Sequence, residues 1–175
     1  MRLLVVPLLV LASFVPTARA QTIVFLGGGY GNEGYLVCRV GARRDLDAVF
    51  LRSGVGHLST GLEAALLHWR NEDDALSGGV LSPNASYHFG SEAWAFRPFV
   101  RAGIGATYLS GTEMAGRYLS TRFQFEDRVG LGFVWRRLRA EVSYAHYSNG
   151  SIRQPNDGVE EVVLTIGWPL QGAGQ

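Results

Sequence analysis

The sequence has 175 residues, of which 47% are hydrophobic, and its 16 basic residues nearly balance its 15 acidic ones. This near-zero net charge lacks the excess of basic residues that is typical of nucleic-acid-binding proteins. The single cysteine, Cys38, excludes an intramolecular disulfide framework. We interpret Cys38 as a small packed residue rather than a nucleophile, because no histidine lies near it in the sequence.

The first twenty residues predict a secretory signal peptide. Arg2 supplies a positive start, residues 3–15 are almost wholly apolar, and the stretch 18–20 (Ala-Arg-Ala) is a small-x-small cleavage site. The apolar run is too short to span a membrane as a helix. We therefore expect a mature domain of residues 21–175, with a formal net charge of 14 − 15 = −1 once the two arginines of the leader are removed.

The mature chain contains repeated segments of about ten residues in which apolar and polar side chains alternate, separated by turn residues. These segments predict strands at 22–31, 33–44, 57–70, 81–90, 96–110, 122–135, 138–148 and 159–169. An even number of strands lets both ends of a closed barrel lie in the periplasm. The sequence thus predicts an all-β fold, an eight-stranded antiparallel transmembrane β-barrel in the outer membrane of a Gram-negative cell.

The connectors fit this arrangement in part. Long polar links follow the third, fifth and seventh predicted strands, and short links follow the fourth and sixth, as is typical of outer-membrane barrels. A short first loop and a longer link near 45–56 depart from the rule. A soluble β-sandwich is the competing fold, because its strands alternate too. Residues 58–70 also fit the period of a helix.

Alternation assigns the more apolar face of each strand to lipid and the face with charges and glycines to a narrow interior. Paired charges are expected inside the barrel, among Arg101, Glu126, Arg128, Arg139 and Glu141. Aromatic girdles are expected from Tyr35, Trp69, Trp94, Tyr108, Trp135, Tyr144 and Trp168. Asp127 is a misfit, because it falls on the apolar face of its strand; a position at the rim, a bound partner or a wrong register would explain it.

Residues 145–161 hold the candidate chemistry. His146 and Ser148 share the outer face of one predicted strand, and Glu160 lies on the apolar face of the next. A hairpin through the turn-rich residues 149–158 brings the three side chains together, since opposed β-carbons on paired strands lie about 4.5–5.5 Å apart.

These three residue types suit ester hydrolysis. A serine hydroxyl needs a base to become a nucleophile, an imidazole can accept its proton, and a carboxylate orients the imidazole. Spacing alone is weak support for such a site, because polar residues at a membrane–water boundary need no function.

The motif from His146 to Gly150, with the QPNDGVE run that ends at Glu160, closely resembles the signature of the outer-membrane lipid A 3-O-deacylases, the PagL family. The stretches 98–112 (PFVRAGIGATYLSGT) and 125–132 (FEDRVGLG) are also similar to that family. The resemblance covers roughly residues 95–169. It implies an eight-stranded barrel whose active site lies on the lipid-facing outer surface.

The resemblance implies that Ser148 is the nucleophile, His146 the general base and Glu160 the orienting acid. It places the oxyanion hole at the Asn156 side chain and at backbone amides after Ser148, those of Gly150 and Ser151, with Asn149 a weaker candidate. The family commonly reads S-N-A-G where this chain has Ser148-Asn149-Gly150-Ser151, so the sequence departs from the family pattern within the oxyanion segment.

The implied reaction removes the 3-hydroxyacyl chain that is ester-linked at position 3 of lipid A, the lipid anchor of lipopolysaccharide. The expected partners are this substrate and the lipids of the outer membrane, and no nucleic acid. No cofactor is implied, and His57, His68 and His88 show no metal-ligand spacing. The alternatives are a non-enzymatic structural or adhesin-like barrel and a phospholipid hydrolase. The sequence leaves the oligomeric state open, a homodimer included.

Overall fold

A computed structural model of the chain describes residues 21–91 and 93–170, so the predicted signal peptide lies outside the described residues. Eight long strands form a closed antiparallel barrel in the order β1-β10-β9-β8-β5-β4-β3-β2. Their bounds are β1 Thr22–Gly31, β2 Leu36–Phe50, β3 Gly56–Arg70, β4 Ala75–Phe89, β5 Phe96–Leu109, β8 Phe123–Trp135, β9 Leu138–Ser148 and β10 Val159–Pro169. The predicted eight-stranded barrel is confirmed, and a sandwich of two sheets is excluded.

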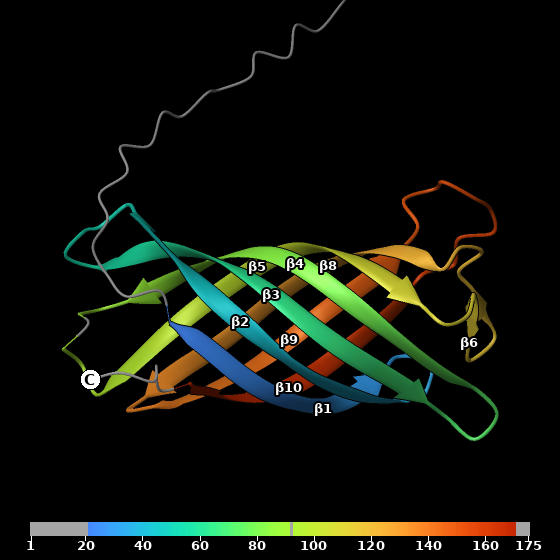
Figure 1. Cartoon of the computed structure of the whole chain (residues 1–175), viewed down its shortest axis with the longest axis horizontal. Coiled ribbons are helices and arrows are strands. Elements are labelled where there is room, and N and C mark those ends of the chain that lie inside the picture. The colour runs from blue at the N-terminus through green and yellow to red at the C-terminus, as the bar shows by residue number, and fades with distance from the viewer. Residues whose placement is uncertain (1–20, 92, 171–175) are drawn as a thin grey trace, which may run out of the picture.

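The connectors divide between the two ends of the barrel (Figure 1). The links 51–55, 90–95 and 136–137 lie at the end where the described chain starts and stops. The links 32–35, 71–74, 110–122 and 149–158 lie at the other end, which we call the loop end. The 110–122 link contains a small hairpin of β6 (Glu113–Met114) and β7 (Arg117–Tyr118). In the described part of the chain, no helix is long and apolar enough to cross a membrane.

Several boundaries differ from the sequence prediction. β4 begins at Ala75 rather than 81, so the link after the third strand is only 71–74 and not the long loop expected. β2 continues to Phe50, with an irregular register between Asp45 and Val49. The segment that also fitted a helix is strand β3, because its odd-numbered side chains fill the barrel interior and its even-numbered ones face outward.

The interior is filled by charged side chains that pair with one another. Arg39 lies 2.8 Å from Glu63 and 2.7 Å from Glu126, and Arg128 lies 2.6 Å from Glu161. The Tyr147 hydroxyl lies 2.7 Å from a Glu126 oxygen and 3.0 Å from a Glu161 oxygen. Buried charges are tolerated when they are paired and hydrogen-bonded in this way. This network joins β2, β3, β8, β9 and β10 from the inside.

The pairing predicted for the interior holds for two of the three arginines. Arg101 pairs with Glu141 at 2.6 Å and also contacts Glu63. Arg139 instead places its guanidinium over the ring of Phe99, 3.7 Å from the ring centre. A cation over an aromatic face is attracted by the ring's negative face, which suits a buried arginine.

The outer wall is apolar, and each of the long barrel strands has at least one exposed leucine, valine or isoleucine side chain. Trp94, Tyr108, Trp135, Tyr144 and Trp168 are exposed, as the predicted girdles require. The prediction was wrong for Tyr35 and Trp69, which are fully buried. Their rings pack together inside the loop end with centres 5.6 Å apart, and the Trp69 indole donates to Glu161 at 2.8 Å. These two rings fill the barrel interior at the loop end and do not belong to an aromatic girdle on the outer surface.

Candidate active site

The residues of the candidate site lie on the outer face of β9 and β10 near the loop end. His146 is directly opposite Glu160 in the register of these two strands. The Nδ1 atom of His146 lies 3.1 Å from Oε1 of Glu160, and both side chains are partly exposed. Ser148 is the last residue of β9 and shares the face of His146, because the two are two residues apart on one strand.

Glu160 is held by the loop between β1 and β2. The Asn32 side-chain amide donates to Oε2 of Glu160, and the Asn32 backbone N–H donates to the Glu160 carbonyl at 3.1 Å. The Tyr35 hydroxyl donates to the same carbonyl at 2.9 Å. Sequence reasoning missed Asn32. The pairing of β1 with β10, which closes the barrel, brings position 32 beside position 160.

The turn before β10 packs against the imidazole. A β-carbon built on Gly158 would lie 2.8 Å from Cε1 of His146, and this glycine has a φ of +66°. Two hydrogen bonds join this turn to the β6–β7 hairpin. Arg117 donates to the Gly158 carbonyl at 3.1 Å, and Asp157 accepts from the Tyr118 backbone N–H at 2.8 Å. The hairpin therefore positions the turn that confines the His146 ring, a contact that the sequence pattern did not reveal.

The 149–158 link is organised by the buried side chain of Asn149. Its amide donates to the carbonyls of Leu119 and Arg153, each at 2.8 Å. The backbone N–H of Asn149 donates to Oδ1 of Asn156 at 3.0 Å. The Asn156 side-chain oxygen thus accepts a hydrogen bond from the residue that follows Ser148. The Nδ2 group is the hydrogen-bond donor of the Asn156 side chain. Asn149, in contrast, uses all its side-chain donors to hold the loop.

Gly150 and Ser151 form a tight turn directly after this asparagine. Both have positive φ, +63° and +66°, and the Ile152 N–H donates to the Asn149 carbonyl at 3.2 Å. Positive φ at both central residues is the mark of a type I′ turn. Within the described residues, the backbone N–H groups of Gly150 and Ser151 have no hydrogen-bond acceptor. The turn therefore presents two neighbouring donors near the end of β9.

The arrangement has the parts that acyl transfer needs, although no hydrogen bond joins Ser148 to His146 among the described residues. A carboxylate that accepts from Nδ1–H leaves Nε2 of the same ring free to take a proton. Catalytic hydrogen bonds of this kind are commonly long until substrate binds. The imidazole and a serine share the outer face of β9, and the turn with the two backbone donors follows directly after this strand.

A groove of about 480 Å³ opens beside this group on the outer wall. His146 and Asp127 lie at its polar end, and Ala102, Ile104 and Val129 are among its apolar lining. Asp127 faces outward and is directly opposite His146 in the β8–β9 register. The predicted register was therefore right, and the misfit carboxylate stands next to the site.

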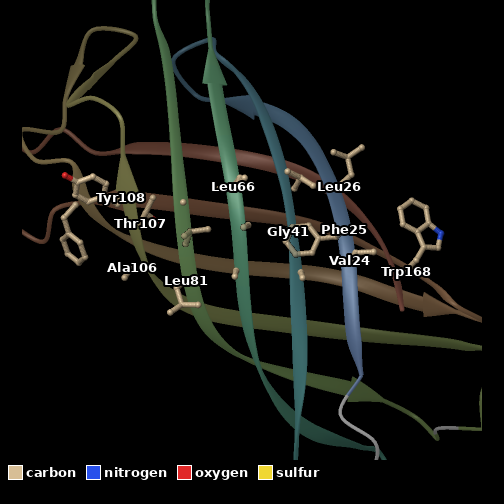
Figure 2. A pocket seen from close by; sticks show the side chains of 17 residues that line it. Val24, Phe25, Leu26, Gly41, Leu66, Leu81, Ala106, Thr107, Tyr108 and Trp168 are labelled. Atoms are coloured by element: carbon tan, nitrogen blue, oxygen red, sulfur yellow. The ribbon is translucent and has the colours of Figure 1, made fainter. Parts of the chain in front are cut away.

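A larger hollow of about 950 Å³ lies elsewhere on the outer wall, where Figure 2 shows Leu26, Leu66 and Leu81 between Tyr108 and Trp168. None of the described residues that line it is an acid, a histidine, a serine or a cysteine. It includes parts of β3, the strand opposite β9 across the barrel. This hollow has the character of lipid-contacting wall and no group for catalysis.

Cys38 and the remaining histidines lie away from the site. Cys38 is exposed on the outer face of β2, directly opposite His68 of β3, so the interpretation as a packed residue without a nearby histidine was wrong. His68 Nδ1 lies 2.9 Å from the Ser77 hydroxyl. The described part of the chain has no cluster of three side chains able to hold a metal ion.

Comparison with known proteins gives a consistent result. The family model described as lipid A 3-O-deacylase (PagL) matches residues 37–169. Lipid A deacylase PagL of Pseudomonas aeruginosa is 32% identical over 171 residues, which cover 94% of this chain and 97% of that protein. The enzyme of the same name from Bordetella bronchiseptica is 43% identical over 70 residues, 39% of each chain.

A solved structure extends the similarity to the fold. The crystal structure of the outer membrane enzyme PagL superposes with a TM-score of 0.80 at 28% identity, covering 85% of this chain and 99% of that one. The family match spans β8, β9 and β10, and so includes His146, Ser148 and Glu160. The chain therefore belongs to the lipid A 3-O-deacylase (PagL) family of outer-membrane enzymes.

Proposed function

We propose that the lipid A 3-O-deacylase activity of this chain is carried by Ser148 as nucleophile, His146 as general base and Glu160 as the acid that orients the imidazole. The observation that carries the proposal is the 3.1 Å contact between His146 Nδ1 and Glu160 on the outer wall, with Ser148 on the same face. A serine esterase needs an imidazole and a carboxylate beside its nucleophile, and this place on the otherwise apolar wall supplies both.

The proposed reaction proceeds in two steps. Ser148 Oγ attacks the carbonyl carbon of the ester at position 3 of lipid A while His146 Nε2 takes the hydroxyl proton. The tetrahedral intermediate then collapses, and His146 returns the proton to the sugar hydroxyl that leaves. Water, activated by the same imidazole, next hydrolyses the acyl-serine and releases a 3-hydroxy fatty acid.

The negative oxygen of the intermediate needs hydrogen-bond donors close to Ser148. The backbone N–H groups of Gly150 and Ser151 and the Nδ2 group of Asn156 are the donors that we assign to it. Each such donor typically contributes about 2.7–4 kcal/mol to transition-state stabilisation. Asn149 is left out of this set, because its donors hold Leu119, Arg153 and Asn156.

The position of the site on the barrel suits a substrate that stays in the membrane. Tyr144 and Val162 continue the outer wall below His146 and Glu160, and both are exposed. An ester of lipid A lies just below the headgroups of the outer leaflet, at the level expected for the loop end of the strands. The acyl chain would thus meet Ser148 without leaving the bilayer.

The test is mass spectrometry of lipid A from cells that make the wild type or Ser148→Ala at equal outer-membrane levels. We expect loss of one 3-hydroxyacyl mass with the wild type alone, and a fall of roughly 10³-fold or more in the rate of the purified variant. Ser91→Ala, at the opposite end of the barrel, is the matched serine control and should behave as wild type.

Other outcomes would count against parts of the proposal. Deacylation by Ser148→Ala would remove Ser148 from its role while keeping the activity. Release of fatty acid from phospholipid vesicles, without any change in lipid A, would assign the same serine to a different lipid. Repeating the assay on purified protein in detergent separates an inactive enzyme from one that its native membrane keeps silent.

A further inference from the structure

The hollow of about 950 Å³ on the outer wall is formed by small residues set between large ones. Ala42 of β2 is directly opposite Ala64 of β3, and both lie on the outer face, as does Gly79 of β4. Leu26 and Leu66, which also line the hollow, are strongly exposed and flank these small residues. The volume lies within the range of cavities that hold small ligands, and the lining is mainly apolar, so the hollow can accept an aliphatic chain.

Two aromatic residues lie on opposite sides of the hollow, as Figure 2 shows. Tyr108 is next to the last residue of β5, at the loop end, and Trp168 is next to the last residue of β10, at the end where the described chain stops. Trp168 is directly opposite Val24 of β1, and Val24 is opposite Ala42. Tryptophan in membrane barrels is enriched at the level of the lipid headgroups. The Trp168 side of the hollow therefore reaches the headgroups at that end of the barrel.

Arg44 lies at the margin of the hollow on the same side. It is the next outward-facing residue after Ala42 on β2, about 6.6–6.8 Å along the strand, and it is directly opposite Thr22, the first residue of β1. Its side chain is exposed, whereas that of Arg43 is buried and lies 2.6 Å from Asp45. Among the described residues, no carboxylate pairs with the Arg44 guanidinium. The apolar hollow thus has one cation at its edge that is available to an anionic group.

The end of the barrel beside Arg44 faces the periplasm. It holds the first and last described residues and the short links 90–95 and 136–137, which is the outer-membrane arrangement. The leaflet on this side consists of phospholipids, whereas lipopolysaccharide occupies the outer leaflet. An arginine on the wall is strongly unfavourable at the bilayer midplane but has little cost at the headgroups, where its guanidinium can bind a phosphate through paired hydrogen bonds.

We propose that the hollow binds one phospholipid of the periplasmic leaflet, with an acyl chain over the pair of Ala42 and Ala64 and the phosphate on Arg44. This site is separate from the deacylation site, because it centres on β2, β3 and β4, whereas the proposed triad lies on β9 and β10. The phospholipid is a bound lipid and not a substrate, since none of the described residues lining the hollow is a serine, a cysteine, a histidine or an acid. It binds only the folded barrel, in which the three strands lie side by side, and so stabilises the fold by mass action.

The test is native mass spectrometry of the purified protein, released from detergent micelles that contain dioleoylphosphatidylglycerol. The spectra count the lipids bound to each barrel as the lipid concentration rises, and so give a Kd. Dioleoylglycerol, which has the same chains and no phosphate, is the comparison lipid. We expect one saturable phospholipid per wild-type barrel and a Kd for dioleoylglycerol that is about fivefold higher, the factor expected for one arginine near an anionic headgroup.

Two variants test the two halves of the site. Arg44→Gln should raise the Kd of the phospholipid about fivefold and leave that of dioleoylglycerol unchanged. Gly79→Leu should raise both Kd values about tenfold or more, because its side chain fills the recess that the acyl chain needs. A β-carbon at Gly79 would meet its nearest atoms at 3.9 Å, an ordinary contact, so the barrel itself accommodates the substitution.

Each variant has a matched control. Gly28→Leu places the same side chain on the outer face of β1, outside the hollow, where a β-carbon would meet its nearest atom at 3.8 Å. Arg137→Gln removes an exposed arginine from the link after β8, across the barrel from β2. Both controls should bind the phospholipid as the wild type does. Circular dichroism in lipid-free micelles checks that every variant is a folded barrel, and Arg44→Gln decides alone if Gly79→Leu fails to fold.

Three results would overturn the inference. Equal Kd values of the wild type for the two lipids would remove the phosphate from the site. Unchanged phospholipid binding in folded Arg44→Gln would remove the arginine. Wild-type dimers that disappear in Gly79→Leu, without any bound lipid, would assign the hollow to a second copy of the chain.

Discussion

Gly158 lies so close to the ring of His146 that any side chain at this position would displace the imidazole: a β-carbon there would be 2.8 Å from Cε1. The same glycine has a φ of +66°, a conformation that other L-residues adopt at a cost of roughly 1–2 kcal/mol. The turn before β10 therefore sets where the proposed base stands.

Gly158→Ala should lower kcat at least tenfold, because a shift of about 1 Å in a catalytic group commonly has a larger effect than that. Gly90→Ala is the matched control. It has a φ of +78°, and its β-carbon would meet the ring of Trp94 at 2.5 Å, at the other end of the barrel. Both variants should lose similar stability in thermal unfolding, and only Gly158→Ala should lose activity. Full activity in Gly158→Ala would show that the His146 ring has room to move.

Asn32→Ala should reduce kcat about tenfold, because it removes a hydrogen bond to the Glu160 carboxylate, and a bond to a charged group contributes about 1.5–3 kcal/mol. Steady-state kinetics with lipid A in detergent measures the effect. Asn71→Ala serves for comparison, since Asn71 accepts from the backbone N–H groups of Asp73 and Asp74 in the β3–β4 link and has no contact with Glu160. An unchanged kcat in Asn32→Ala would mean that Glu160 needs no support from β1–β2.

Ser151→Gly should stabilise the protein by about 1 kcal/mol while the activity is retained. The φ of +66° at Ser151 suits glycine better than serine, and the proposed oxyanion donor is the backbone N–H, which the substitution keeps. Urea unfolding in micelles, followed by tryptophan fluorescence, measures the change. Lower activity in the glycine variant would assign a role to the Ser151 hydroxyl that the backbone alone does not fill.

Glu161→Gln should destabilise the barrel by about 3–5 kcal/mol, because it leaves the buried Arg128 guanidinium with one carboxylate fewer. The Trp69 indole would also lose its carboxylate acceptor. Arg137→Met, at an exposed position between β8 and β9, is the control and should change stability by less than about 1 kcal/mol. Equal melting temperatures for the two variants would contradict a stabilising role for the interior network.

Local patterns predicted the strands and the faces of this barrel, because each strand by itself shows apolar and polar side chains alternating with a period of two residues. That is why Asp127 could be assigned to the outer face beside apolar neighbours before its contacts were known. Only the start of β4 was missed, because Gly78 and Gly79 were assigned to the link before the strand. In the structure Gly78 allows a close approach, since a β-carbon there would lie 2.7 Å from the Tyr108 carbonyl oxygen.

Contacts between distant segments could not be predicted in this way. The contact of Asn32 with Glu160 depends on the closure of the barrel between its first and last strands. The contact of Arg117 with Gly158 depends on how one outer loop folds over another. The inward rings of Tyr35 and Trp69 depend on the space left inside the loop end, which no single strand determines.

The alternation along β9 has a consequence for how this protein tolerates mutation. Its odd-numbered residues, such as Tyr147, belong to the ionic interior, and its even-numbered residues, such as His146, belong to the reacting surface. Substitutions on one face can accumulate while the other is conserved, so substrate preference and folding can evolve separately. A one-residue insertion or deletion within the strand affects both faces together, because every side chain beyond it moves to the opposite face.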